Sequence, residues 1–439
     1  FAINNSDNND NVTNTSNNQI PCTQTIDMVY NATFLSANAF PPTLLTLRFV
    51  DEFNTALFPN VLPASITSLE FGYWYNQPMS RGSLPASLTN LKFGYKFNQI
   101  IGPGLLPPPL IHLEFGYHFN AELVVSVLPT ALATLKLGDS YNYSIAPRVL
   151  PQSLKYLNVG HTFNRYLEPA SLPTGLEKLV LGRGYNLVIV PNVLPNSLLN
   201  LKFDLRFNKP IRHDSLPDSL TSLTFGEAFN QSIESGVLPD GLISLTLGNT
   251  FDLPLKKDTL PTTLQTLEFG KNYTRYISQG VLPDSLTQMT LHINYDHGLW
   301  HLPSSVKLIN VDLQTIQPIW FPLMVPKQDL SIKKLIGKQR PLAIPYHPDV
   351  NTYHIYQNRN GPMVTESQRS YYITVRMLSN DHSVVLSENI EGYITHNRFI
   401  PFRRSNKHGK GHVSLPTSTT NEPPSPVSSC SASDNLGYI

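Results

Sequence analysis

The sequence predicts a repeat solenoid made of parallel β-strands, with few or no helices, disordered termini and a small C-terminal β element. Three observations support this prediction. A Leu-Pro pair, or its variant Phe40-Pro41, opens twelve successive units of 22 residues without an insertion or deletion. Each unit contains an apolar–polar–apolar triplet that is typical of a strand. A proline interrupts every unit, and no unit shows the periodicity of a helix.

The unit has a fixed internal pattern, numbered here from the Leu of the Leu-Pro pair as position 1. In the unit that begins at Leu84, the strand triplet at positions 8 to 10 is Leu91, Lys92 and Phe93. Positions 5, 8 and 10 are apolar, position 11 is usually Gly, position 14 is always Phe or Tyr, and position 18 is mostly aliphatic. The glycine ends the strand where the chain turns in little space. One unit alone leaves both flat faces exposed, so we expect units to stack in order into one parallel sheet.

Position 15 is Asn in nine consecutive units. We expect its amide to satisfy backbone groups in a buried turn and to bond along the stack. The substitution Asn120→Ala is therefore predicted to cost about 1–3 kcal/mol through an unsatisfied buried group. Position 15 changes to Asp252, Thr274 and Asp296 in the last units, where we expect looser packing. The nine residues are Asn54, Asn76, Asn98, Asn120, Asn142, Asn164, Asn186, Asn208 and Asn230.

The flanks of the repeats differ from them in composition and divide the chain into segments. An Asn-rich start and a Ser/Thr/Pro-rich end are typical of disorder, whereas the apolar stretches next to the repeats are expected to cap the stack. Short strand patterns after the second cap predict a small β-rich module. The predicted segments are a disordered leader at 1–19, an N-terminal cap at 20–39, the solenoid at 40–303, a C-terminal cap and linker at 304–345, the β-rich module at 346–413 and a disordered tail at 414–439.

Composition narrows the class of protein. Only 14% of the 439 residues are charged and the net charge is +1, which argues against nucleic acid as a partner. Two cysteines, Cys22 and Cys430, do not form a disulfide framework. No apolar run approaches the length of a transmembrane segment. The chain begins at Phe1 rather than Met, so we expect residues to precede it, and an upstream targeting signal or domain stays open.

The pattern LPxSLxxLxFGxxFNxxI, spelled out in residues 84–101, is similar to the FNIP-repeat family, a short leucine-rich-repeat-like family of social amoebae and amoeba-infecting giant viruses. The resemblance covers residues 40–303 and implies a leucine-rich-repeat-like solenoid that acts as an interaction module. It further implies a cytoplasmic adaptor or scaffold in intracellular signalling or in ubiquitin-type recruitment. Some members of the family carry F-box or kinase domains, and neither is visible in this sequence.

Ten side chains in units two to five form the predicted partner surface. Position 9 alternates in charge between adjacent strands, which predicts ion pairs that fix the register and keep the surface soluble. Positions 12 and 13 add aromatic and basic groups, a mixture typical of protein-binding hot spots. The alternative is that these rings only pack on one another along the stack. The ten residues are Glu70, Tyr73, Trp74, Lys92, Tyr95, Lys96, Glu114, Tyr117, His118 and Lys136.

Two basic stretches lie after the repeats. Residues 332–340 alternate basic and apolar side chains, which gives the hypothesis of a calmodulin or phosphoinositide effector helix, against a solvated loop favoured by Gly337 and Pro341. The second stretch is interpreted as a nuclear-import or anionic-surface patch, or else as a solvated tail. The basic residues are Lys333, Lys334, Lys338 and Arg340 in the first stretch, and Arg398, Arg403, Arg404, Lys407 and Lys410 in the second.

No known catalytic signature is present in the sequence, which lacks a Walker loop, GxSxG, HExxH and paired CxxC motifs. His297 and His301 are four residues apart, but no third ligand accompanies them, so no metal site is predicted. We therefore predict a non-enzymatic scaffold without cofactor, whose partner is another protein. An alternative from a different class is a carbohydrate-binding solenoid that uses Tyr73, Tyr95 and Tyr117 as a platform for sugars.

Overall fold

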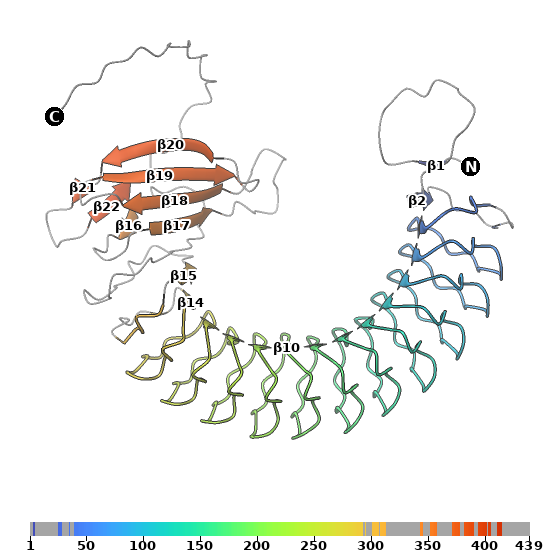
Figure 1. Ribbon diagram of the computed structural model, residues 1–439, viewed down its shortest axis with the longest axis horizontal. Coiled ribbons are helices and arrows are strands. Elements are labelled where there is room, and N and C mark those ends of the chain that lie inside the picture. Colours follow the sequence, from blue (N-terminus) through green and yellow to red (C-terminus); the bar gives the residue numbers. More distant parts are fainter. Residues whose placement is uncertain are drawn as a thin grey trace, which may run out of the picture.

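The computed structural model describes residues 39–292 and 301–306 with their side chains, also Leu35 and Tyr295, and elsewhere the backbone of the strands named below. Figure 1 shows an arc of stacked coils, with the strands along its inner edge and the connecting loops along its outer edge. No helix is present in the described residues. Coils are numbered here from the unit that begins at Phe40, so coil 2 begins at Leu62 and coil 12 at Leu282.

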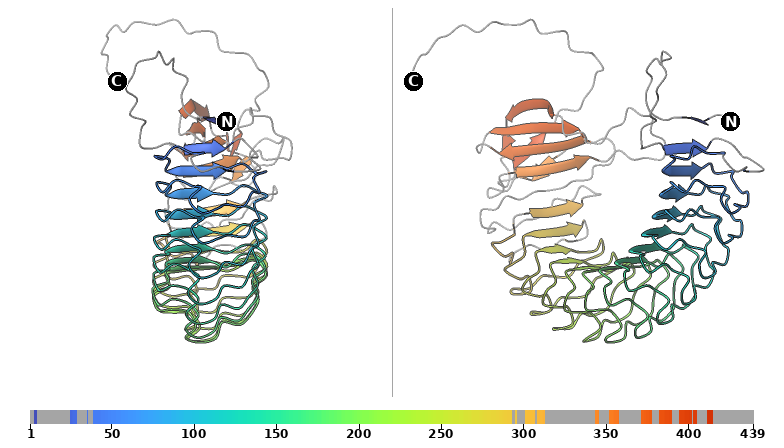
Figure 2. Two further views of the ribbon diagram at one scale, coloured as in Figure 1. Left: turned by 90° about the vertical axis from the view of Figure 1, so that its right-hand side faces the viewer. Right: turned by 45° about the vertical axis from the view of Figure 1, so that its right-hand side comes forward.

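Each coil contributes one strand to a single sheet, and neighbouring strands are parallel and follow sequence order (Figure 2). Equivalent positions pair across the sheet, as Leu91 does with Leu113. The prediction of a parallel-stranded repeat solenoid is thus confirmed. The repeat strands are β3 (Thr46–Phe49), β4 (Ser68–Glu70), β5 (Asn90–Lys92), β6 (His112–Glu114), β7 (Thr134–Lys136), β8 (Tyr156–Asn158), β9 (Lys178–Leu181), β10 (Asn200–Phe203), β11 (Ser222–Thr224), β12 (Ser244–Thr246), β13 (Thr266–Glu268) and β14 (Gln288–His292).

The sheet continues beyond both ends of the repeats. Strand β2 (Thr25–Met28) lies parallel to β3, and β15 (Leu308–Asp312) lies parallel to β14. The terminal strand β1 (Ile3–Asn4) is antiparallel to β2. The segments on either side of the repeats therefore contribute strands of their own to the same sheet.

Two further sheets are formed by the C-terminal part of the chain. One is an antiparallel meander in the order β17-β18-β19-β20, and the other has the order β16-β22-β21. Most of these strands fall in the range predicted for a β-rich module, while the segment boundaries stay predictions. The strands are β16 (Ala343–Pro345), β17 (Thr352–Gln357), β18 (Tyr371–Met377), β19 (His382–Asn389), β20 (Ile394–Pro401), β21 (Arg403–Arg404) and β22 (Gly411–Ser414). Apart from β1 and β22, the leader and tail predicted to be disordered lie outside the described residues.

The core of the solenoid is a set of apolar columns that run through successive coils. In coil 3, Leu88, Leu91, Phe93, Phe97 and Ile101 are all buried. The aromatic rings at position 14 form an unbroken stack from coil 1 to coil 12, with centroids 5.9 to 6.4 Å apart. This stack explains why position 14 admits only Phe or Tyr, because a smaller side chain opens a cavity between two rings.

Three tight turns recur along the coils, the first in all twelve coils and the other two in most of them. The N–H of position 5 donates to the carbonyl of the proline at position 2, that of position 14 to position 11, and that of position 22 to position 19. In the third turn, position 21 has a positive φ in eleven coils, from 61° at Asn60 to 81° at Gly82. A residue with positive φ after a frequent proline fits the third residue of a type II turn. The Pro-Asn and Pro-Gly pairs at 59–60, 103–104 and 191–192 are the sequence signal for this turn.

The glycine at position 11 is required by the spacing of the coils. A Cβ atom added to Gly94 lies 1.7 Å from the carbonyl oxygen of Gly72 in the preceding coil. No side chain fits at such a distance, so glycine is required where the backbone of this coil passes the carbonyl of the preceding one. The expectation that glycine stands where space is short therefore has a specific cause, the neighbouring carbonyl.

The coils fan outward from the sheet, and this produces the arc. Exposed rings at position 12 are 4.6 to 4.8 Å apart, buried rings at position 10 of the first coils 5.4 to 5.5 Å, and rings at position 14 up to 6.4 Å. Strands about 4.8 Å apart cannot separate further without losing their hydrogen bonds. The sheet therefore lies on the concave side of the arc (Figure 1), and positions 7 and 9 are the strand positions that are not buried, as in β5 and β6.

The Asn column differs from its prediction in burial. In each case the Oδ1 atom accepts the N–H of position 15 in the next coil, as Asn120 does from Asn142 at 3.0 Å. The column lies at the surface and Asn120 is exposed, so the prediction of a buried amide is wrong. Water can reach the N–H that a substitution leaves unpaired, which lowers the expected cost of Asn120→Ala to about 1 kcal/mol. The ladder also continues into the last coils, since Asp252 accepts the N–H of Thr274 at 2.8 Å.

Candidate interaction surface

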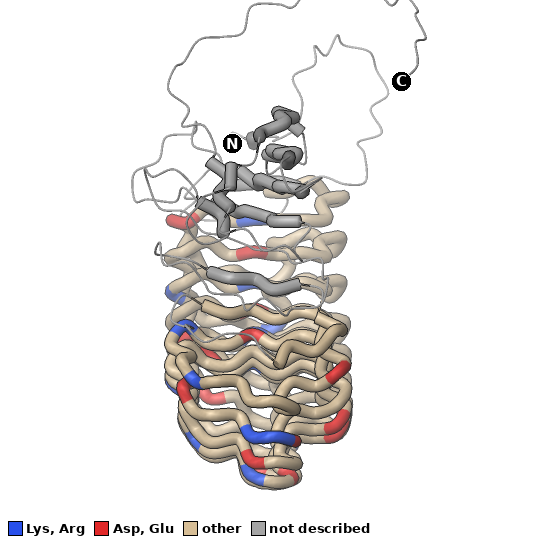
Figure 3. Tube along the Cα trace, turned by 90° about the vertical axis from the view of Figure 1, so that its left-hand side faces the viewer, with Lys and Arg blue, Asp and Glu red and all other residues tan. Residues whose placement is uncertain are grey.

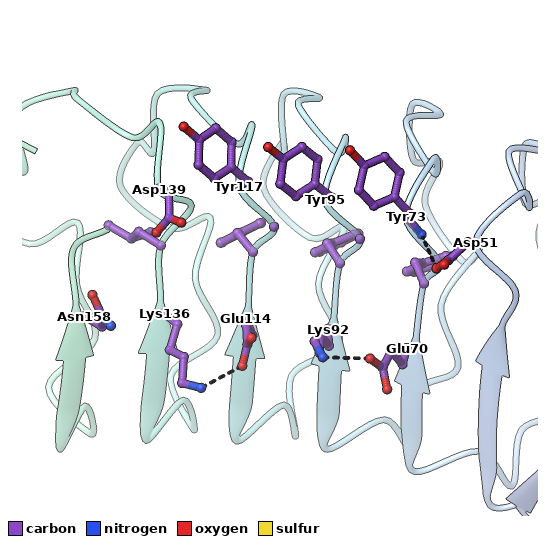
Figure 4. Close-up of a pocket in the computed structure, with 16 residues that line it drawn as sticks. Asp51, Glu70, Tyr73, Lys92, Tyr95, Glu114, Tyr117, Lys136, Asp139 and Asn158 are labelled. Carbon is purple, nitrogen blue, oxygen red and sulfur yellow. Dashed lines mark hydrogen bonds and ion pairs between the residues drawn. The ribbon is translucent and has the colours of Figure 1, made fainter. Parts of the chain in front are cut away.

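A shallow groove of about 470 Å³ runs along the concave side of the first six coils, at the carboxyl ends of the strands (Figure 4). Its floor contains the glycine column, with Gly94 and Gly116. One side carries the charged residues of position 9, and the other carries the tyrosines of position 12. Seven of the ten residues predicted as a partner surface line this groove: Glu70, Tyr73, Lys92, Tyr95, Glu114, Tyr117 and Lys136.

The charged side of the groove is held by ion pairs between adjacent strands. Glu70 binds Arg48 at 2.8 Å and Lys92 at 2.7 Å, and Glu114 binds Lys136 at 2.9 Å. Within the described residues no ion pair joins Lys92 to Glu114, so the predicted ladder consists of two separate groups. These side chains are partly exposed, and each pair contributes about 0–1 kcal/mol, which favours a role in register over one in stability.

The pairing shifts the titration of these groups. Partial burial raises the pKa of Glu70, but the hydrogen bond and charge of Lys92, together with Arg48, outweigh it and bring the pKa below its ordinary value. The hydrogen bond to Glu114 raises the pKa of Lys136. Both groups therefore remain charged at neutral pH, and the pattern of signs on this side of the groove is fixed.

The tyrosine side of the groove is a row of stacked rings, named here the tyrosine row (Tyr73, Tyr95 and Tyr117). Tyr73 and Tyr95 have centroids 4.6 Å apart and planes inclined by 5°, and Tyr95 and Tyr117 are 4.8 Å apart and inclined by 12°. Tyr73 is 37% and Tyr117 40% exposed. Loss of solvation and the neighbouring rings raise the pKa of Tyr95. The rings cover one another's faces, so their edges and hydroxyls point to solvent.

Side chains at position 13 contact these rings. Trp74 meets Tyr73 edge to face with centroids 5.0 Å apart, and His118 meets Tyr95 in the same way at 5.0 Å. The Nζ atom of Lys96 lies 5.4 Å from the ring centre of Trp74. The three predicted residues that do not line the groove, Trp74, Lys96 and His118, thus contact the rings of the tyrosine row or one another.

Two aspartates that the sequence did not single out also line the groove. Asp51 precedes the tyrosine row by one coil and Asp139 follows it by one coil, both at position 12. The Oδ1 atom of Asp51 accepts the N–H of Tyr73 at 3.1 Å, and Oδ2 of Asp139 lies 3.1 Å from Nδ1 of His161. Their shared repeat position with the tyrosines is the signal that could have identified them.

The groove changes character in the later coils. A smaller hollow of about 180 Å³ occupies the same face of coils 8 to 11, and its polar lining includes Lys202, Asp204, Glu227 and Glu268. Position 12 carries no aromatic ring there. The tyrosine row therefore distinguishes the first half of the concave surface from the second.

The remaining site predictions fall largely outside the described residues. Residues 332–340 lie outside them, as do Lys407 and Lys410. Arg398 lies in β20, and Arg403 and Arg404 form β21, so this part of the second basic stretch belongs to sheets and is not a plain tail. Across the part of the chain that the structure describes, no three His, Cys, Asp or Glu side chains are grouped as metal ligands are. Nor does that part contain a helix with the length and apolar character needed to cross a membrane.

Comparison with known proteins gives two matches of different kinds. The family model described as FNIP Repeat matches in eight windows that together span residues 30–294. Among solved structures, the chain is similar to the protein in "The crystal structure of CroV588 a novel circular LRR protein structure", with a TM-score of 0.65 and 36% sequence identity. That match covers 75% of this chain and 49% of the other, so the chain spans about half the length of CroV588. No curated protein matches.

Proposed function

We propose that this chain, which belongs to the FNIP-repeat family, is a non-catalytic scaffold that binds another protein along the concave groove of coils 1 to 6. The observation that carries the proposal is the tyrosine row, an exposed aromatic surface held rigid by Trp74 and His118. Rigid aromatic side chains lose little conformational entropy on binding and dominate the energy of protein interfaces.

The electrostatics of the surface favour a protein over a nucleic acid. On the side of the described coils that Figure 3 shows, charged residues of both signs are scattered and no continuous basic stripe is visible. The groove itself contains Glu70, Lys92, Glu114 and Lys136 in alternation. Binding to a phosphate backbone depends on clustered positive charge, whereas protein interfaces mix both signs with aromatic groups.

The biological role proposed for the scaffold follows from the family resemblance. The resemblance implies an adaptor or scaffold, so we place the chain in intracellular signalling or in ubiquitin-type recruitment in the cytoplasm. The groove supplies the recruiting surface in this proposal. A separate role for residues 332–340 in binding calmodulin or phosphoinositides remains a hypothesis, testable by capture on calmodulin with and without calcium.

The geometry of the tyrosine row argues against the carbohydrate-binding alternative. Sugars stack on the face of an aromatic ring, where their C–H groups meet its negative potential. Tyr95 has both faces covered by its neighbours at 4.6 and 4.8 Å. Only the outward faces of Tyr73 and Tyr117 are left, so the row offers no continuous platform for a sugar chain.

Selection from a displayed peptide library tests the proposed function. Peptides are selected on the wild-type chain and then measured on the double variant Trp74→Ala, Tyr95→Ala. The matched control is Phe58→Ala, Tyr166→Ala, which removes two exposed aromatic side chains that do not line the groove. We expect the selected peptides to bind the control as they bind wild type and to lose binding to the groove variant. Equal binding to all three proteins would contradict the proposal.

A further inference from the structure

We propose that the two ends of the tyrosine row bind guanidinium groups, so that the groove takes an extended, arginine-containing segment of its partner. This inference rests on the proposed function and specifies the chemistry of the partner. Asp51 and Asp139 lie beyond the two ends of the row, next to Tyr73 and Tyr117 respectively (Figure 4).

Each end of the row has a ring face on which no other ring stacks among the described residues; Trp74 and His118 contact Tyr73 and Tyr117 at steep angles instead. Tyr117 stacks on Tyr95 with its inner face, and the next rung of the column holds Asp139 in place of a further ring. At the other end, Tyr73 stacks on Tyr95, and the preceding rung holds Asp51. A carboxylate is too short to cover a tyrosine ring. The stack of rings therefore ends on both sides in a tyrosine that has no further stacked ring and has a carboxylate in the next rung of the groove.

Guanidinium is the group that matches both parts of such an end. It is planar and stacks on an aromatic face, where the negative potential of the ring attracts its charge. Its paired N–H groups bind a carboxylate in the same plane with two hydrogen bonds. An ammonium group satisfies the charge but cannot continue the stack, so arginine is preferred to lysine.

The other charges of the groove are already engaged. Lys92 and Lys136 are paired with Glu70 and Glu114. The cation of Lys96 lies 5.4 Å from the ring centre of Trp74 and 5.6 Å from that of Tyr95, and its Nζ atom is 3.3 Å from Nε2 of His118. No ion pair of Asp51 is present in the part of the chain that the structure describes, and Asp139 meets only the imidazole of His161 there. Negative charge is therefore what the two ends of the row offer to a partner, and a basic segment complements it.

The distance between the ends predicts the spacing of the arginines. Asp51 and Asp139 are four coils apart, which at the ring spacing of 4.6 to 4.8 Å is about 19 Å. An extended chain rises about 3.3 Å per residue, so about six residues span this distance. Side chains an even number of residues apart point to the same side of such a chain. The preferred ligand is an extended peptide with arginines at positions i and i+6.

Fluorescence anisotropy on the full chain tests this inference with labelled peptides that carry two arginines six residues apart in a Gly/Ser sequence. Comparison peptides place the arginines three residues apart, or replace both by lysine or by neutral citrulline. The protein variants are Asp51→Asn and Asp139→Asn, and the matched control is Asp218→Asn, an exposed aspartate outside the groove. Thermal melting of each variant verifies that it is folded.

We expect the peptide with the six-residue spacing to bind most tightly and the citrulline peptide to bind at least about tenfold more weakly, as expected for loss of a charged hydrogen-bonded pair. Asp51→Asn and Asp139→Asn are each expected to weaken binding by about the same factor, and Asp218→Asn to leave it unchanged. Equal affinity for arginine and citrulline peptides, no effect of either groove variant, or no binding to wild type overturns the inference.

The result also separates this inference from the proposed function. If library peptides without arginine bind wild type and lose binding to the Trp74→Ala, Tyr95→Ala variant, the guanidinium sites are wrong and the groove remains the partner surface. If no peptide depends on the groove, both proposals are wrong. Binding of a glycan at the row, detected on a glycan array and lost in the same variant, also overturns the guanidinium assignment.

Discussion

The Asn ladder allows a single hydrogen bond between two coils to be removed and restored. In the wild-type chain the N–H of Asn142 donates to Oδ1 of Asn120 at 3.0 Å. Asn120→Ala removes the acceptor and leaves this N–H facing water, whereas Asn120→Asp keeps an oxygen in the same place. The chain already contains this replacement, because Asp252 accepts the N–H of Thr274 at 2.8 Å.

The expected cost follows from the exposure of the site. A net hydrogen bond is worth about 1 kcal/mol when water can replace it, so we expect that cost for Asn120→Ala and almost none for Asn120→Asp. A change of about 1 kcal/mol corresponds to roughly fivefold faster exchange of the Asn142 amide. Substituting Asn76, Asn120 and Asn164 together by Ala, each two coils from the next, is expected to cost about 3 kcal/mol because distant sites add.

Hydrogen exchange followed by mass spectrometry measures the local effect, and urea unfolding measures the global one. The peptide that contains Asn142 is expected to exchange faster in Asn120→Ala and at the wild-type rate in Asn120→Asp. If the two variants behave alike, the acceptor oxygen is not what the column contributes. A loss well above about 3 kcal/mol in Asn120→Ala would show that the site is buried after all.

Three further substitutions test other parts of the coil. Tyr75→Phe is expected to stabilise the chain by about 1 kcal/mol in urea unfolding, because the buried hydroxyl of Tyr75 has no hydrogen-bond partner among the described residues. A loss of stability would show that the hydroxyl does have a partner. Ala170→Gly is expected to raise the free energy of unfolding by about 0.5–1 kcal/mol, because Ala170 has a φ of 63°. The control Gly82→Ala should lower the free energy of unfolding. If Ala170→Gly destabilises the chain and Gly82→Ala stabilises it, the turn assignment is wrong. Glu70 has a lowered pKa when folded, so its contribution is present above its ordinary value of 4.5 and lost as the pH falls below it. The free energy of unfolding, measured above and below pH 4.5, should fall less on acidification in Glu70→Gln than in wild type. An equal fall in both proteins would mean that the ion pairs of Glu70 contribute nothing to stability.

The architecture can be predicted from the sequence because the same residue pattern recurs in twelve consecutive units. A 22-residue period, an apolar triplet and a glycine column leave a parallel stack as the one arrangement that buries Leu91, Phe93 and Phe97 together. The Pro-Gly and Pro-Asn pairs at positions 20 and 21 are also a sequence signal, in this case for the type II turn. The signal is weak because position 21 also holds Ser126, Arg148 and Ala170, residues that do not suggest a positive φ.

Burial and ring orientation are harder to derive from sequence. The pattern does not distinguish an Asn that caps a buried turn from one that accepts an N–H at the surface, since both stand at a fixed repeat position. The alternatives for Tyr73, Tyr95 and Tyr117 are a surface that binds a partner and rings that only pack on one another; the structure shows the packing and the exposure of Tyr73 and Tyr117, while binding stays a prediction. The proposed role of Asp51 and Asp139 could not be derived from the sequence, because it depends on their position at the two ends of the stacked rings.

The most direct test of the partner surface is a hydrogen-exchange footprint of a bound library peptide on the full chain. We expect slower exchange in the segments that follow β4, β5 and β6, at 72–75, 94–97 and 116–119, and no change along the outer turns of the same coils. Protection confined to the outer turns, for example at 124–127, with none at the tyrosine row, would contradict the claim that the concave groove is where this protein binds its partner.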